Sequence, residues 1–232
     1  MGYSFEFNQR TSESQGIYVQ SRPEMPGKKK KLSFLEIGGR DEMLSVGSSI
    51  YENCEITLEC SYRTEPDNWN RKRRQIGQWL HGSGELILSD DPEVFWKVKD
   101  VQVTKFERPL RKHGIFDVKF VCSPFEYLVE GQSFKTLQEV LFNPGGLSKP
   151  EYKISGEGIC TLTVNGKTMK ANIGQNLTIN TELMLAYRED GTMMNSSVTG
   201  EYKDLYLKSG ENVISVSPGF SITVKPNWRY FW

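Results

Sequence analysis

The sequence predicts a mainly β protein of two β-sandwich domains, the first of which contains a single α-helix. Two observations support this fold class. Apolar and polar residues alternate over several short segments, as in strands that bury one face, and these segments are 54–60, 116–122, 160–164, 183–187 and 220–224. Clusters of turn-forming residues divide the chain near residue 143, and 232 residues are enough to bury two small cores. We therefore expect domains at 1–142 and 143–232.

The cysteines are placed like small apolar residues. All four are in phase with the apolar positions of their predicted strands: Cys54, Cys60, Cys122 and Cys160. The first two lie on one strand, about 20 Å apart at about 3.3 Å per residue, whereas a disulfide needs Cα atoms within about 7 Å. Neither C-x-x-C spacing nor histidine pairs accompany them, so we expect no structural zinc site. We expect reduced thiols in the core.

The alternation changes phase within one predicted strand. Trp96 and Val98 are in one phase, whereas Val101 and Val103 are in the other. An inserted residue near 99–100 produces such a change, so the pattern indicates a β-bulge or a turn there.

One segment has helical rather than strand periodicity. Its long side chains recur at spacings of three and four: Trp69, Arg73, Ile76, Trp79 and Leu80. Asp67 or Asn68 is available as an N-cap, and Gly82 follows the last apolar residue, so we predict a helix over 68–80. Its basic residues 71–74 suggest either a solvated helix face or a contact with phosphate. The balanced charge of the chain favours the solvated face.

A lysine run at 28–31 precedes the apolar segment LSFLEI at 32–37. Two interpretations are open. Lysines discourage the edge of a sheet from pairing with other chains, and they also make charged contacts in assemblies. We favour the first interpretation.

Turn signals and closely spaced strands characterise the second predicted domain. The cluster Asn143–Gly146 opens it. Asn165-Gly166 is the strongest hairpin signal in the chain, because these residues supply the positive φ angles of a type I′ turn. About eight short strands between such turns fit a two-sheet sandwich. Trp228, Tyr230 and Trp232 alternate on a predicted closing strand.

We find no residues that predict catalysis, a cofactor or a metal site. The pattern G-x-S-x-G is absent, and His81 and His113 are the only histidines. Asn165–Thr168 ends like a phosphate-binding loop, but Thr161 stands where its first glycine belongs. Asp90 and Asp91 could be the paired carboxylates of a glycoside hydrolase. They precede a proline, as turn residues do, and neighbours on a strand point to opposite faces, so we do not expect them to act as a pair. An enzyme is therefore not expected.

The charge balance argues against nucleic acid as a partner. Lys plus Arg and Asp plus Glu number 29 each, so no net positive field favours a polyanion. The N-terminus lacks the basic start and apolar run of a signal peptide, and no stretch approaches the about 18 apolar residues of a membrane span. We expect a soluble protein made in the cytoplasm, with no membrane partner.

Several short motifs follow one another in a recognisable order. They are LEIGGRDEML (35–44) followed by Tyr51 and Asn53, the helix ending in Trp79-Leu80, LILSDDPEVFWKVKDV (86–101), CSPFEY (122–127), Asn143–Gly146, LYLKSGENVISV (205–216) and Pro226–Arg229. This order resembles the siphophage distal tail protein family over residues 15–232. Gly38 stands where the family usually has proline, and Glu42 where it usually has a second glycine. These departures concern the geometry of one turn.

The resemblance implies a non-enzymatic structural protein of the virion, made in the bacterial host cytoplasm and placed at the distal end of a long flexible phage tail. In this family six copies form a ring through their N-terminal domains, while galectin-like C-terminal domains connect to receptor-binding and other baseplate proteins. The tail tube docks on one side of the ring and the tail-associated tip protein on the other. A ring needs complementary patches on one domain. Our candidates are an exposed sheet edge or the helix at 68–80, without particular interface residues.

A carbohydrate-binding module is the alternative from another class, because galectins bind sugar on one sheet. Residues 143–232 contain no histidine, and Trp228 is their only tryptophan before the last residue. No stacking platform for a sugar is evident, and the close spacing of strands leaves no room for the carbohydrate-binding insertions of longer relatives. We expect host attachment through docked proteins rather than direct sugar contact.

Overall fold

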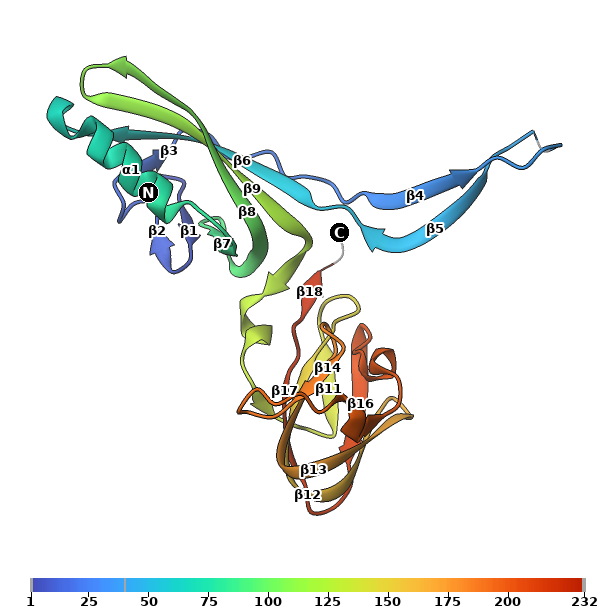
Figure 1. The fold of residues 1–232 in the computed structure, drawn as a ribbon. Helices are drawn as coiled ribbons and strands as arrows, with labels where there is room; N and C mark the ends of the chain where they lie inside the picture. Colours follow the sequence, from blue (N-terminus) through green and yellow to red (C-terminus); the bar gives the residue numbers. More distant parts are fainter. Residues whose placement is uncertain (1, 40, 231–232) are drawn as a thin grey trace. The chain divides into compact units, whose positions relative to one another are not determined.

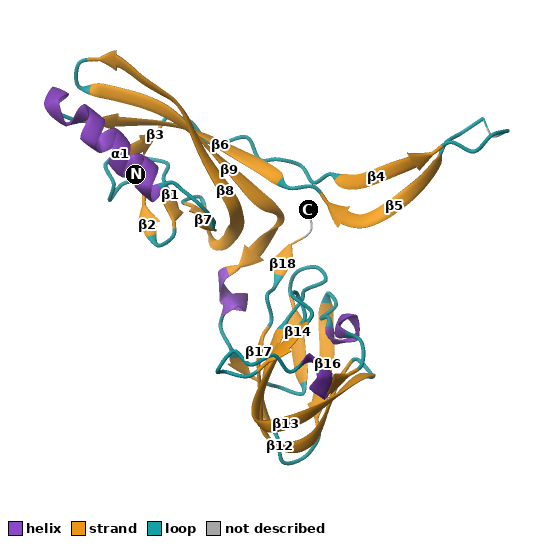
Figure 2. Cartoon of the chain, in the orientation of Figure 1, coloured by secondary structure: helices purple, strands orange, loops and turns teal. Residues whose placement is uncertain are grey.

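The computed structural model describes residues 2–39 and 41–230, and it divides the chain into two compact domains. The first domain extends to Glu126 and the second begins at Tyr127 (Figure 1). Strands dominate both domains, as the orange segments of Figure 2 show. Among the described residues, α1 (Trp69–Trp79) is the one α-helix. The predicted fold class, mainly β with two β-sandwich domains and a single helix in the first, is confirmed.

One hydrogen-bonded sheet forms most of the first domain, in the order β2-β1-β7-β8-β9-β6-β3. Its strands are β1 (Phe5–Phe7), β2 (Arg10–Thr11), β3 (Ile17–Val19), β6 (Cys54–Arg63), β7 (Gly84–Leu88), β8 (Asp91–Leu110) and β9 (His113–Leu128). The sheet curls over itself, because the rings of Phe5 and Phe7 on β1 lie 5.7 and 5.5 Å from the ring of Phe120 on β9. One continuous sheet therefore supplies both layers of this sandwich.

The pairing of β6 with β9 shows why these segments are strands. Every second residue of β6 from Cys54 to Tyr62 is buried, and every second residue of β9 opposite them is buried too. The antiparallel register places Ile56 against Phe120 and Leu58 against Val118, and all four side chains are fully buried. The predicted alternation at 54–60 and 116–122 is confirmed.

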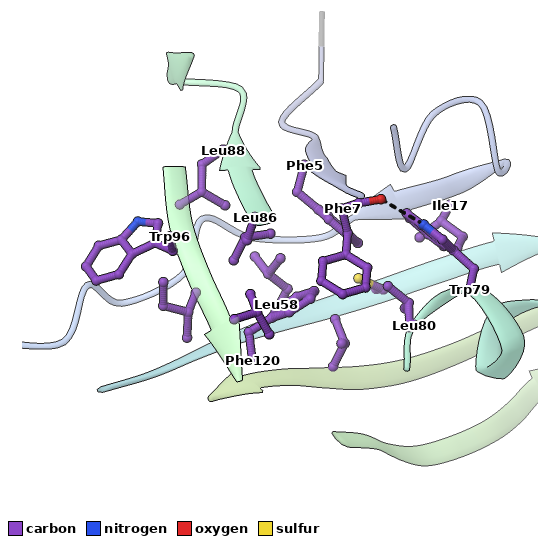
Figure 3. Close-up of a cluster of buried hydrophobic side chains, with 14 of the residues drawn as sticks. Phe5, Phe7, Ile17, Leu58, Trp79, Leu80, Leu86, Leu88, Trp96 and Phe120 are labelled. Atoms are coloured by element: carbon purple, nitrogen blue, oxygen red, sulfur yellow. Dashed lines mark hydrogen bonds between the residues drawn. The ribbon is translucent and has the colours of Figure 1, made fainter. Parts of the chain in front are cut away.

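The helix α1 covers the core of the first domain with its apolar side. Ile76 and Trp79 are buried, and the Trp79 ring stacks on the Phe5 ring at 5.5 Å. The indole Nε1 of Trp79 donates a hydrogen bond of 3.1 Å to the carbonyl oxygen of Phe7 (Figure 3). A 3₁₀ turn at Pro66–Asn68 precedes the helix, and Asn68 is the N-cap residue without a side-chain hydrogen bond. The predicted helix at 68–80 is confirmed within one residue at each end.

The phase change in β8 does not come from a turn. The strand runs without interruption from Asp91 to Leu110. Trp96 and Val98 are buried in the core, and Val101 and Val103 pack against the same core although they are in the other phase. An extra residue accommodated between them brings residues of both phases to one core. The contacts therefore favour the bulge over the turn.

The second domain is organised around one long hairpin. Its strands are β10 (Lys135–Thr136), β11 (Val140–Asn143), β12 (Glu151–Val164), β13 (Lys167–Asn180), β14 (Leu185–Tyr187), β15 (Val198–Thr199), β16 (Gly210–Val216), β17 (Ser221–Lys225) and β18 (Arg229–Tyr230), with 3₁₀ turns at Val129–Gln132, Asn195–Ser197 and Tyr202–Leu205. Asn165 and Gly166 join β12 to β13 with φ angles of 50° and 80°, which confirms the predicted type I′ turn. The strands β12 and β13 have 14 residues each, so the prediction of short strands alone was wrong.

Glycines bend this hairpin so that it serves two sets of partner strands. Gly156 and Gly158 have φ angles of 149° and 104°, which favour glycine. Before the bend β12 pairs with β17, and after it β12 pairs with β16. Buried residues from both halves, such as Tyr152 and Leu162, belong to one core. The bend therefore lets a single hairpin enclose the second core.

The domains divide earlier than residue 143, where the turn cluster suggested a boundary. Residues 127–142 belong to the second domain, because β10 pairs with β17 and β11 with β16. The cluster at 143–146 is a turn rather than a linker, and Asn143 and Gly145 in it are buried. The Asn143 Nδ2 donates to the carbonyl oxygen of Gly146 at 2.8 Å, and its Oδ1 accepts from the N–H of Gly145 at 3.0 Å. These bonds satisfy the buried side-chain amide of Asn143 and close the turn.

The end of the chain also packs into the second domain. The backbone N–H of Leu128 donates to the carbonyl oxygen of Trp228 at 3.0 Å, and Trp228 is buried. Of the predicted closing strand, Tyr230 belongs to β18, Trp228 directly precedes it, and Trp232 lies outside the described residues.

Replacing Gly145 with Ala should destabilise the second domain. A Cβ atom there would lie 2.3 Å from the carbonyl oxygen of Arg229, a backbone atom with little freedom to move. We expect a loss of about 1–3 kcal/mol in the free energy of unfolding, as for other overpacked sites. Chemical denaturation followed by circular dichroism measures it. Unfolding at the denaturant concentration of the unchanged chain would contradict the close approach.

Gly77→Ala is the matched control. Gly77 is exposed on α1, and a Cβ atom there meets nothing within 4 Å. Alanine is the better helix former, so this variant should be more stable by about 0.5–1 kcal/mol in the same measurement.

Candidate assembly site

A two-stranded hairpin without a core is the most unusual feature of the first domain. The strands β4 (Lys30–Leu35) and β5 (Leu44–Tyr51) pair with each other in an antiparallel sheet of their own. Figure 1 shows them as a long ribbon that extends away from the helix and the larger sheet. We call residues 30–51 the arm. Two strands alone are marginally stable in water, so an arm of this kind is expected to gain its stability from contacts with another surface.

The arm exposes apolar side chains that a strand normally buries. The exposed fractions are 50% for Leu32, 62% for Phe34, 53% for Leu35, 40% for Ile37, 57% for Met43, 42% for Leu44 and 62% for Ile50. Leu35 lies directly opposite Leu44, whereas Phe34, the preceding residue on β4, points to the other face. Apolar side chains are therefore present on both faces. Contiguous exposed apolar groups mark interaction surfaces.

Aromatic and basic side chains lie at the base of the arm. The Tyr51 ring is 5.6 Å from the Phe125 ring of β9 in an edge-on arrangement. The Nζ of Lys30 is 5.8 Å from the Tyr51 ring centroid, and that of Lys28 is 5.3 Å from the Phe125 ring centroid. Lys28 and Lys29 precede β4, and Lys30 and Lys31 belong to it. Both strands of a two-stranded sheet are edge strands, so the lysine run lies at a sheet edge, as the favoured interpretation expects. Whether it makes a charged contact in an assembly stays a prediction.

The basic residues of α1 fit a solvated helix face. Arg71, Arg73 and Arg74 are exposed. Lys72 is half-buried, and its Nζ donates to the carbonyl oxygen of Gln15. Burial lowers the pKa of Lys72 from its ordinary value. The structure does not gather these residues into a cradle for a phosphate.

The other polar residues that the sequence singled out lie apart. His81 and His113 are exposed at the end of the helix and at the start of β9. Asp90 lies in the turn between β7 and β8, where its carboxylate is 3.9 Å from the Nε of Arg22. Burial, followed by the charge of Asp90, raises the pKa of Tyr3. The two histidines and Asp90 therefore do not form one constellation.

A shallow hollow of about 200 Å³ lies beside this turn. Leu88, Val94 and Trp96 form its apolar wall, and carboxylates such as Asp91 line it as well. No histidine, cysteine or serine lines it, so it offers no nucleophile and base pair of the hydrolase kind. Within 2–39 and 41–230 there is no group of three His, Cys, Asp or Glu side chains able to hold a metal ion. No helix in these ranges has the length and apolar content to cross a membrane.

The second domain exposes a different apolar surface. Val140 of β11 lies directly opposite Val213 of β16, and Phe142 follows two residues later on the same face. Their exposed fractions are 47%, 58% and 62%. Trp228, in contrast, is buried and does not offer its ring to a sugar. Sequence periodicity did not single out these exposed residues, because they have the pattern of ordinary strands.

Comparison with known proteins agrees with the resemblance that the sequence motifs indicated. No family model and no curated protein matches the chain. Among solved structures, the crystal structure of the Dit protein (gp 19.1) of bacteriophage SPP1 matches with a TM-score of 0.76 and 13% sequence identity. The match covers 100% of both chains. That protein is described as a paradigm of the hub adsorption apparatus in phages that infect Gram-positive bacteria. The chain thus has, over its whole length, the fold of a siphophage distal tail protein.

Proposed function

We propose that this chain is a structural protein of a phage tail, a distal tail hub whose copies close into a hexameric ring. The observation that supports it most is the fold shared with the SPP1 hub protein along the full length of both chains. A shared fold alone does not specify function. The proposal therefore also relies on the arm, which independently indicates assembly.

The arm suits a ring contact between copies. Its exposed apolar side chains, such as Phe34 and Leu35, need a surface that the first domain of the same chain does not supply. In a head-to-tail contact, the arm of one copy packs on a different surface of the next copy. Contacts of this type close into a ring when the rotation between copies divides the circle. The first domain would then form the ring that joins the tail tube to the tip protein.

The second domain, galectin-like by the resemblance, would anchor receptor-binding and other baseplate proteins. The exposed face with Val140, Phe142 and Val213 supports such a role, because apolar side chains that are exposed together favour protein partners. In this proposal the protein is made in the host cytoplasm, acts in the virion at the distal end of the tail, and contributes no catalysis.

A carbohydrate-binding module is the competing function. Sugar-binding sites commonly stack an exposed aromatic ring on the sugar. Trp228 is buried and no histidine follows residue 143, so neither Trp228 nor a histidine is available for such a site, and the exposed ring of Phe142 lies on the apolar face with Val140 and Val213. Host attachment is therefore proposed to be indirect, through the proteins that the ring anchors.

The mass of the purified chain in solution tests the ring. We expect light scattering to give about six times the chain mass of 26.6 kDa over a range of concentrations, because head-to-tail contacts saturate only when the ring closes. A strict monomer at every concentration, also in the presence of the neighbouring tail proteins, would contradict the proposal.

Replacing Phe34 and Leu35 with serine tests the arm. Both side chains are more than half exposed, so their loss should leave the circular dichroism spectrum of the folded chain almost unchanged while the mass falls towards that of the monomer. Ile159→Ser is the matched control, because Ile159 is 73% exposed in the second domain, away from the arm in the sequence. An intact hexamer in the arm variant would exclude these side chains from the ring contact.

A further inference from the structure

Two cysteines lie directly opposite each other where the arm joins the larger sheet. Cys54 is the first residue of β6, and its register partner on β9 is Cys122. Directly opposite residues of an antiparallel pair point to the same face, with Cα atoms about 4.5–5.5 Å apart. A disulfide needs a Cα separation of about 4.4–6.8 Å. The backbone therefore already holds the two residues at the spacing of a disulfide.

Both thiols are free and differ in access. The Sγ of Cys54 donates to the carbonyl oxygens of Ser123 at 3.3 Å and of Cys122 at 3.8 Å. The Sγ of Cys122 donates to the carbonyl oxygen of Phe120 at 3.6 Å. Cys54 is 7% exposed and Cys122 is fully buried. A reagent from solvent would thus reach Cys54 first.

The other two cysteines lack such a partner in the register. Cys60 lies opposite Phe116, and Cys160 lies opposite Ala171. Both are buried in the cores of their domains. They serve as internal controls, because they share the burial of the pair but not its pairing.

Hydrogen bonding and burial shift the pKa values of the two thiols in opposite directions. The hydrogen bond with the Cys122 thiol, helped by the charge of Lys28, holds the pKa of Cys54 below its ordinary value although burial and Glu126 oppose this. The same hydrogen bond, together with burial, raises the pKa of Cys122. Cys54 is therefore the thiol that loses its proton more readily, and the thiolate is the nucleophile in disulfide exchange.

We propose that Cys54 and Cys122 form an oxidisable thiol pair that closes into a disulfide between β6 and β9 at the base of the arm. The oxidant is a small disulfide of the glutathione class. The Cys54 thiolate attacks one sulfur of this oxidant and displaces the first glutathione thiolate, which takes up a proton. The Cys122 thiol loses its proton, and its sulfur attacks the Cys54 sulfur and displaces the second glutathione. Two protein thiols are oxidised, and one disulfide is reduced to two thiols.

The bond would fix the strand from which the arm emerges. Two residues separate Cys54 from Tyr51, the last residue of β5, and Tyr51 contacts Phe125 three residues beyond Cys122. Oxidation would therefore join the base of the arm covalently to β9. A chain assembled in a reducing cytoplasm would acquire this bond after release. This consequence for the ring rests on the proposed function, whereas the oxidation itself does not.

Thiol counting on the full-length chain tests the pair. The native protein is incubated with oxidised glutathione, denatured under conditions that block exchange, and titrated for free thiols. We expect two of the four thiols to be lost, and peptide mass spectrometry to find one crosslink, between the peptides that contain Cys54 and Cys122. Four remaining thiols, a glutathione adduct that stays on Cys54, or a crosslink to Cys60 or Cys160 would overturn the proposal.

Serine variants sharpen the result. Cys60→Ser and Cys160→Ser should still lose two thiols, whereas Cys54→Ser should keep all three of its thiols. Circular dichroism checks that each variant is folded. If a variant does not fold, the crosslink mapped in the unchanged chain still tests whether Cys54 and Cys122 pair. Light scattering on the same samples separates the two proposals, because a monomer that forms the crosslink contradicts the ring but not the thiol pair.

Discussion

The antiparallel ladder between β6 and β9 supports the rest of the first domain. Its buried face supplies half of the core, and Phe120 on this face meets Phe5 and Phe7 from β1, so the curled sheet closes on it. The helix then packs on Phe5 through Trp79. The first pair of the ladder is Cys54 with Cys122, at the point where the arm begins. A change of register by one residue would turn every core side chain outward, so the core, the helix and the arm all depend on this pairing.

The arm imposes a second constraint, because no other layer of the first domain covers its apolar side chains. A strand that buries one face contributes hydrophobic free energy of about 25 cal/mol per Å² of apolar surface removed from water. In the single chain, Leu32, Phe34 and Leu35 remain at least half exposed, so much of this hydrophobic free energy is not gained. A second copy can restore it. This reasoning supports the proposed assembly without reference to any relative, whereas the likeness to the SPP1 hub protein establishes the shared fold.

In the second domain, polar groups hold the C-terminal segment against the residues that follow β11. Asn143 closes the turn after this strand, and Arg229, which is buried, donates from its Nε to the carbonyl oxygen of Leu147 at 2.7 Å. The side chain of Asn227 donates to the carbonyl oxygen of Lys149 at 2.9 Å. Buried polar groups with partners specify one arrangement, because any other leaves them unsatisfied. The bent hairpin β12–β13 and these bonds together make the domain a closed sandwich.

The sequence by itself determined the features that depend on local pattern. These are the strands at 54–60 and 116–122, the helix near 68–80, and the type I′ turn at Asn165-Gly166, where the residue types dictate the backbone. Only the tertiary structure decided which strands pair. It placed residues 127–142 in the second domain, brought Cys54 opposite Cys122, and left the arm without a core. Periodicity reports that one face of a strand is covered but not what covers it, because pairing joins residues far apart in the chain.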